Sequence, residues 1–213
     1  MRIDAELCHV SGHGGFFAIR TGPPGPGYRS TADGFADLIA STAQRTGAPD
    51  LRTAASLVQM SVASRLWSPA IACATAFGVV PDFTGLYRAD DSAELLLCRP
   101  TGVRAHRDED LAGLLYTHVV ERTLEPLAAG LPVPIAPGLL AGNVASALVG
   151  AARAWGVVRP DLCAPAVRLT HTLLRTGQLR DTGKMKGDLD FRRRSCCLYY
   201  RVAAGAKCAD CGI

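Results

Sequence analysis

The stretch CCLYYRVAAGAKCADCGI, residues 196–213, holds four of the eight cysteines of the chain in the pattern C-C-x10-C-x2-C. Cys208 and Cys211 form a C-x2-C pair, which lets one turn of the backbone aim both sulfurs at a common point. Cys196 and Cys197 are adjacent. Because neighbouring side chains of a regular strand point to opposite faces, both can reach one site only from an irregular backbone. The pattern predicts four thiolate ligands around one metal centre.

The spacing alone leaves the identity of that centre open. A [2Fe–2S] cluster offers two irons, and therefore a wider target for an adjacent cysteine pair, which mildly favours it over a single zinc ion. The spacing matches neither of the common ferredoxin patterns, and a structural zinc site is the main alternative. A thioredoxin-type redox pair lacks the surrounding βαβ pattern, and a disulfide framework needs an oxidising compartment. Gly205 and Gly212 are expected to supply the backbone bends of the loop.

The run RRSCCLYYR at residues 193–201, followed by KCADC at residues 207–211, resembles the C-terminal iron–sulfur segment of the FhuF-type ferric-siderophore reductases. The resemblance implies a [2Fe–2S] cluster as cofactor. The ligands that it implies are Cys196, Cys197, Cys208 and Cys211. It further implies one-electron reduction of an Fe(III)-siderophore, the substrate, with release of Fe(II) in the cytoplasm or at the inner face of the membrane. The small-residue run at residues 142–147 is also similar to the family, but no role is transferred to it.

Two other functions fit the same residues. The chain could be an iron–sulfur electron carrier without a substrate of its own, whose partner is another enzyme. It could also be a structural zinc-binding interaction domain, in which the metal has no redox role. The visible absorption of a [2Fe–2S] protein, which bleaches on reduction, separates the two iron–sulfur functions from the zinc domain.

The positive charge of the chain is concentrated near the cysteines. From residue 180 onward there are eight basic and four acidic side chains, and the difference of +4 equals the formal net charge of the whole chain. The basic residues are Arg180, Lys184, Lys186, Arg192, Arg193, Arg194, Arg201 and Lys207. An oxidised all-thiolate [2Fe–2S] centre carries a charge of about −2, which nearby cations offset, and they thereby raise its reduction potential. They could also steer an acidic electron donor; the alternative is a solvated basic tail.

The composition predicts one domain with a small appendage. The chain has 213 residues, of which 48% are hydrophobic, enough for a real core. We expect a mostly helical, siderophore-binding domain over residues 1–180 and a cluster-binding segment over residues 181–213. The N-terminal residues MRIDAE are acidic where a signal peptide is apolar. The longest apolar run, residues 66–80, is shorter than the roughly 20 residues of a transmembrane helix. A cytoplasmic protein without a transmembrane segment is therefore predicted.

Several function classes are disfavoured by missing motifs. No basic stripe alternates with aromatic residues, so nucleic-acid binding is not expected. Neither G-x-G-x-x-G after a strand nor a Walker loop occurs, so we expect no nucleotide or flavin site. Electrons must then come from a separate donor, a flavodoxin- or ferredoxin-type protein or a small reductant. No catalytic residue is expected beyond the cluster itself, and the substrate-binding residues are not identified.

The pattern of hydrophobic residues and of Gly, Pro and capping residues predicts a mostly α fold with a small β component, an α+β class. Helices are expected at residues 33–46, 51–77 with an interruption at Ser68 and Pro69, 108–127 capped by Asp108, 138–155 and 160–175. A hairpin is expected at residues 7–21, two strands at residues 85–89 and 93–99, and a polar hinge at residues 180–190.

A few single residues outside the cysteine segment attract attention. His118 is expected to be a satisfied core histidine rather than a ligand, and Cys73 a small core residue. His9 and His13, beside Cys8, have metal-ligand spacing, but a turn with a solvent-facing histidine is the commoner arrangement. Asn143 is the polar residue of its helix that is expected to face a cavity.

Overall fold

The computed structural model describes residues 1–107 and 110–212, and 54% of the chain is helical while 14% is strand. The predicted α+β class is therefore confirmed. The helices are α1 (Asp4–Ser11), α2 (Ala36–Thr46), α3 (Leu51–Phe77), α4 (Asp110–Leu115), the π-helix η3 (Tyr116–Leu124), α5 (Glu125–Ala129), α6 (Pro137–Val158) and α7 (Cys163–Leu173). The strands are β1 (Arg20–Thr21), β2 (Tyr28–Ser30), β3 (Val79–Asp82), β4 (Leu86–Ala89), β5 (Leu95–Leu97), β6 (Thr101–Arg104), β7 (Gly183–Lys186) and β8 (Asp190–Arg193).

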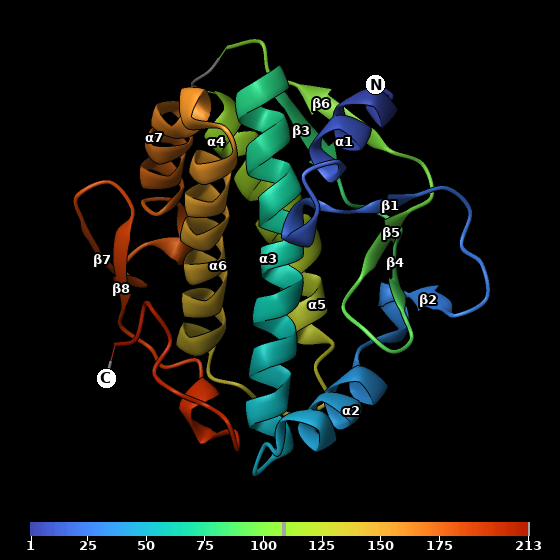
Figure 1. The fold of residues 1–213 in the computed structure, drawn as a ribbon, viewed down its shortest axis with the longest axis vertical. Helices are drawn as coiled ribbons and strands as arrows, with labels where there is room; N and C mark the ends of the chain where they lie inside the picture. Colours follow the sequence, from blue (N-terminus) through green and yellow to red (C-terminus); the bar gives the residue numbers. More distant parts are fainter. Residues whose placement is uncertain (108–109, 213) are drawn as a thin grey trace.

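Two long helices, α3 and α6, lie side by side in the centre of the molecule (Figure 1). Small side chains, among them Ala63, Ala145 and Ala152, are fully buried on these helices and allow their backbones to approach closely. Helix α7 packs against α6, and the strands β1 to β6 lie on the opposite side of α3 (Figure 1). The C-terminal segment, red in Figure 1, runs beside one end of α6.

The interruption expected at Ser68 and Pro69 is wrong, because α3 continues through both residues. Pro69 has no N–H to donate to the helix, which normally costs stability. The neighbouring Ser68 hydroxyl donates to the carbonyl of Ser64 at 2.8 Å. The residues on both sides of Pro69 are fully buried, so tertiary packing holds the helix straight against the local preference of proline.

The predicted ends of the neighbouring helices are confirmed. Helix α2 ends at Gly47, whose φ of +62° is the left-handed conformation that glycine adopts without strain. The Asp50 carboxylate accepts a hydrogen bond from the Thr53 N–H at 2.8 Å and caps α3. Leu51, the first residue of α3, is 47% exposed, while Ala55, Val58, Val62 and Leu66, which follow it at helical spacing, are buried.

The hairpin expected at residues 7–21 is wrong. Its first part is helix α1, and only the two residues of β1 are strand. Ile3, Leu7 and Val10 are fully buried and recur at helical spacing, and acidic residues occupy the first turn of α1. A short run with few apolar residues fits both the periodicity of a strand and that of a helix. Here contact with the core favours the helix.

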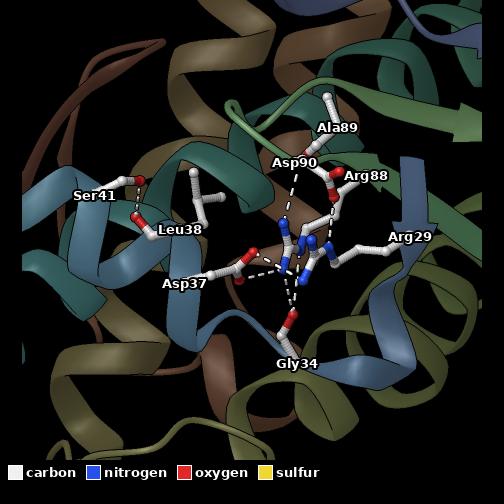
Figure 2. A network of polar contacts seen from close by, with 8 residues as sticks. All are labelled: Arg29, Gly34, Asp37, Leu38, Ser41, Arg88, Ala89 and Asp90. Atoms are coloured by element: carbon white, nitrogen blue, oxygen red, sulfur yellow. Dashed lines mark hydrogen bonds and ion pairs between the residues drawn. The ribbon is translucent and has the colours of Figure 1, made fainter. Parts of the chain in front are cut away.

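The strand pair expected at residues 85–89 and 93–99 is confirmed as β4 and β5, which pair antiparallel with Leu86 opposite Leu97. They belong to a four-stranded sheet in the order β1-β5-β4-β2, while β3 pairs with β6. Figure 2 shows how this sheet is joined to α2. The buried guanidinium of Arg88 donates to the carbonyl oxygens of Gly34 and Ala89 and to the carboxylate of Asp37, which also pairs with Arg29.

The helix expected at residues 108–127 is present from Asp110 as α4, η3 and α5 in succession, while its expected cap, Asp108, lies outside the described residues. His118, on the π-helix, is buried as predicted, but the expectation that its ring is fully hydrogen-bonded is wrong. Within the described residues its Nδ1 has no hydrogen-bond partner, and the Asp82 carboxylate lies 3.9 Å away. Burial lowers the pKa of His118, because the charged ring loses water, and Asp82 offsets part of that effect.

The polar hinge expected at residues 180–190 is wrong, since β7 and β8 form a hairpin there with Lys184 opposite Arg192. Gly187, at φ +62°, makes the turn between the strands. The preceding helix, expected at residues 160–175, is confirmed as the short 3-10 turn η4 (Pro160–Leu162) followed by α7. A regular hairpin rather than a flexible hinge therefore leads into the cysteine segment.

Candidate metal centre

The cysteine segment is anchored to the β7–β8 hairpin by backbone hydrogen bonds. The Arg193 N–H donates to the carbonyl of Asp210 at 3.1 Å, and the Arg194 N–H donates to the carbonyl of Thr182 at 2.8 Å. A further bond, from the Cys211 N–H to the Cys208 carbonyl at 3.0 Å, closes the C-x2-C turn. The two cysteine pairs are thereby placed at one end of the same hairpin.

The structure brings two of the four thiols into contact. The sulfurs of Cys197 and Cys208 are 3.6 Å apart, and Cys197 is only 2% exposed. The Cys196 sulfur accepts a hydrogen bond from the Leu198 N–H at 3.3 Å. Leu198 has φ +67°, an unusual value for a residue with a side chain, and this kink is the irregular backbone expected at the adjacent pair.

The four thiols are not all gathered around one point. Among the described residues, no three His, Cys, Asp or Glu side chains come together closely enough to hold a metal ion. In the absence of a metal the pKa of Cys208 is raised to about 12, first by burial and then by the neighbouring Cys197, while Arg193 acts in the opposite direction. Thiolate ligands must lose their protons to bind a metal, so binding is coupled to proton release here. The donor types and the Cys197–Cys208 contact fit a thiolate-bound centre.

Polar side chains of the two central helices, α3 and α6, connect the cysteine segment to the core by hydrogen bonds. The Ser56 hydroxyl, on α3, donates to the Cys197 carbonyl at 2.8 Å. The Asn143 side-chain amide, on α6, donates to the Ser56 carbonyl at 3.0 Å and to the Gln59 side-chain oxygen at 2.9 Å. The expectation that Asn143 faces a cavity is wrong, because the residue is fully buried. Its side-chain oxygen accepts a hydrogen bond from the Arg193 guanidinium at 2.6 Å.

Ser56 and Gln59 were not predicted from the sequence, although a signal was present. Both are polar residues among the buried apolar residues of α3, where polar side chains normally occur only when another polar group meets them. The run at residues 142–147, to which no role was transferred, also faces the cysteine segment. A Cβ atom on Gly142 would lie 2.1 Å from the Ser195 hydroxyl, so glycine lets the segment approach α6.

The two glycines expected to bend the loop act in another way. Neither Gly205 nor Gly212 is among the glycines with positive φ in the described chain. A Cβ on Gly205 would lie 2.0 Å from the Tyr199 carbonyl oxygen, and one on Gly212 would lie 2.2 Å from the Arg193 carbonyl oxygen. Close approach of two backbones, rather than a special backbone conformation, therefore requires glycine at both positions.

The basic residues near the cysteines have different environments. Arg192 is exposed, and Arg194 is more than half exposed with Asp181 at 3.7 Å, so these two match a solvated tail. Arg201 pairs with Asp50 at 2.9 Å. Arg193 is only 2% exposed and lies between the cysteine segment and α6. The exposed members give the segment a basic rim, and Arg193 places one charge in its interior.

The remaining candidate residues lie elsewhere. The rings of His9 and His13 are exposed, and their centroids are 5.7 Å apart in an edge-to-face contact. Cys73 is fully buried, as predicted, and burial raises the pKa of its thiol to about 12. None of the helices described is both long enough and apolar enough to cross a membrane.

Asp210, within the C-x2-C turn, carries a buried carboxylate that ties this turn to α6. It accepts from the Ser146 hydroxyl at 2.6 Å and from the Arg153 guanidinium at 2.8 Å. We expect Asp210→Ala to destabilise the protein by about 2 kcal/mol, because both donors lose an anionic partner of low exposure. Limited proteolysis should show earlier cleavage after Lys207, and thermal unfolding should report the loss. Asp161→Ala removes an exposed ion pair with Arg159 and serves as the control, with no measurable change expected.

Comparison with protein families finds a match to the FhuF 2Fe-2S C-terminal domain at residues 193–211. Comparison with curated proteins and with solved structures found no match. The matched residues begin at the buried Arg193 and end at Cys211, so they include both cysteine pairs and the contact between Cys197 and Cys208. Residues 193–211 are thus similar to the FhuF 2Fe-2S C-terminal domain, and this match points to a [2Fe–2S] cluster as the cofactor.

Proposed function

We propose that the protein is a ferric-siderophore reductase that transfers one electron to chelated Fe(III) and releases Fe(II) in the cytoplasm. The observation that carries the proposal is the match of residues 193–211 to an FhuF 2Fe-2S domain, with all four cysteines inside it. The proposed ligands of the cluster are Cys196, Cys197, Cys208 and Cys211. When bound, the cluster supplies a site that accepts and donates one electron.

The chain itself supplies the environment of that site. The Leu198 N–H donates to the Cys196 sulfur, and hydrogen bonds to ligand sulfurs raise the potential of a thiolate-bound centre. Ser56 and Asn143 fix the backbone at Cys197. In this proposal residues 181–213 bind the cluster, and residues 1–180 form the domain that receives the siderophore.

The chemistry of the substrate explains why one electron is sufficient. Hydroxamate and catecholate oxygens are hard anionic ligands, and they bind Fe(III) far more strongly than Fe(II). Reduction alone therefore loosens the iron, and the protein forms no covalent intermediate. The electron reaches the protein from a flavodoxin- or ferredoxin-type donor or from a small reductant, and exposed cations such as Arg192 and Arg194 favour an acidic donor.

The proposal is tested by mixing dithionite-reduced protein, without air, with ferric hydroxamate and ferric catecholate chelates. We expect the visible absorption of the oxidised cluster to return with one Fe(II) formed per cluster, measured with a chromogenic Fe(II) chelator. The gallium(III) complexes of the same chelators are the control, because gallium has a similar size but is not reduced under these conditions. Indifference to every ferric chelate, with ready electron exchange with a flavodoxin, would identify an electron carrier instead. A colourless protein with one bound zinc would identify a zinc domain.

A further inference from the structure

Arg193 is a buried cation with no anionic partner among the described residues. Its guanidinium donates to the Asn143 side-chain oxygen at 2.6 Å, to the Ser195 hydroxyl at 3.4 Å and to the Met60 sulfur at 3.8 Å. These partners are all neutral. Within the same described part of the chain its Nε has no hydrogen-bond partner, although only 2% of the residue is exposed.

A buried charge without an opposite charge beside it destabilises a folded protein. Arginine stays protonated in proteins, so it cannot escape burial by losing its proton. An ion taken out of water is normally compensated by an opposite charge. The same chain shows the usual solution at Arg88, which is 1% exposed and bonds to the Asp37 carboxylate (Figure 2). Among residues 1–107 and 110–212 Arg193 has no such carboxylate, which indicates that its partner is a group other than one of these side chains.

The location of Arg193 indicates what that partner is. Arg193 is the last residue of β8, and its backbone N–H bonds to Asp210 in the C-x2-C turn. Its guanidinium also bonds to Ser195, the residue before Cys196, and to Asn143. Asn143 in turn bonds to the Ser56 hydroxyl, which donates to the Cys197 carbonyl. The Asp210 carboxylate does not serve Arg193, because Ser146 and Arg153 occupy it. The missing negative charge thus belongs on the side of the thiols.

We propose that Arg193 is the buried counter-ion of the thiolate-bound metal centre, a positioning residue whose ion pair is completed only when the centre is present. The inference rests on the proposed function for the identity of the anion, a [2Fe–2S] centre with a charge of about −2. Two consequences follow. The centre stabilises the fold beyond its own bonds, because it neutralises a charge that the metal-free protein leaves unpaired. Arg193 also raises the reduction potential, because reduction adds a further negative charge beside it.

The first test replaces Arg193 by Met, which keeps an unbranched apolar stem and removes the charge. In the metal-free protein we expect Arg193→Met to unfold at the wild-type temperature or above it. In the loaded protein we expect a lower unfolding temperature, so that the difference between loaded and metal-free protein shrinks. The one-electron potential should fall by about 59 mV, a tenfold change in the reduction equilibrium. Arg193→Lys should restore most of the potential, since it keeps the charge.

Arg192→Met is the matched control, because Arg192 is the exposed neighbour on the same strand. It should change neither the potential nor the difference in unfolding temperature. Equal destabilisation of the loaded and metal-free forms by Arg193→Met would show a purely structural role and overturn the proposal. An unchanged potential with an intact cluster would overturn it as well.

A second pair of variants covers the case in which Arg193→Met does not fold. Met60→Glu puts a carboxylate beside the guanidinium, at a position that is not fully buried, and Met60→Gln is its neutral control. We expect Glu, but not Gln, to raise the unfolding temperature of the metal-free protein and to reduce the gain on loading. No difference between Glu and Gln would contradict an unpaired charge at Arg193. A zinc centre with four thiolates also carries a charge of −2. The expected changes in unfolding temperature therefore remain a test of the Arg193 counter-ion even if ferric chelates do not reoxidise the protein and the reductase proposal fails.

Discussion

Replacing Cys208 by Ser is expected to leave the protein without its cluster, with loss of essentially all bound iron, sulfide and visible absorption. Cys208 is the thiol that touches Cys197, so it is central to the proposed ligand set. A serine hydroxyl does not ionise near neutral pH and is a poor substitute for a thiolate toward iron. Cys197→Ser should have the same effect. Iron and sulfide analysis of protein isolated without air, together with its absorption spectrum, measures the outcome.

Cys73→Ser is the control for that experiment. Cys73 is fully buried in α3, away from the cysteine segment, and burial raises the pKa of its thiol to about 12, so it is unreactive. This variant should lose some stability and keep the full iron content. Metal-free Cys208→Ser protein should unfold at the same temperature as metal-free wild type. Full iron in the Cys197 and Cys208 variants would show that other residues are the ligands.

The cysteine segment could be predicted from sequence because its chemistry is encoded within a few residues. The pattern C-C-x10-C-x2-C requires no knowledge of the rest of the fold. Local capping signals were equally readable, since Gly47 and Asp50 each act through neighbouring backbone groups. Where the sequence prediction failed, the cause was contact between distant residues. Pro69 remains inside α3 because the core surrounds it, and residues 7–11 are helical because Leu7 and Val10 meet the core.

The interior of the site was the least predictable part. Arg192, Arg193 and Arg194 are three consecutive residues of the same type. Side chains alternate between the two faces of β8, and this alternation buries Arg193. That alternation was not predicted, because no strand was expected over the residues of β8. Ser56 and Gln59 meet Asn143 across two helices, from positions more than eighty residues away in sequence. No local pattern encodes such a meeting, although polar residues in apolar helices indicate that something polar lies opposite.

Replacing Arg88 by Met is expected to destabilise the protein by about 3–5 kcal/mol, the usual cost of breaking a buried ion pair. For a chain of this size that corresponds to an unfolding temperature lower by roughly 10 °C. The guanidinium of Arg88 satisfies the carbonyls of Gly34 and Ala89 and the carboxylate of Asp37, so its loss leaves three acceptors without this donor (Figure 2). Thermal or denaturant unfolding of the metal-free protein measures the change.

Arg29→Met is the control, because Arg29 contacts the same Asp37 from a position that is 43% exposed, where an ion pair contributes little. The two buried arginines should then behave in opposite ways. Arg88 is paired within the protein, so its replacement should lower the unfolding temperature of the loaded and metal-free forms equally. Arg193 is unpaired within the described chain, so its replacement should lower the unfolding temperature of the loaded form alone. A larger loss in the loaded form for Arg88→Met would mean that the sheet and α2 also respond to the metal centre, and that the difference is not specific to Arg193.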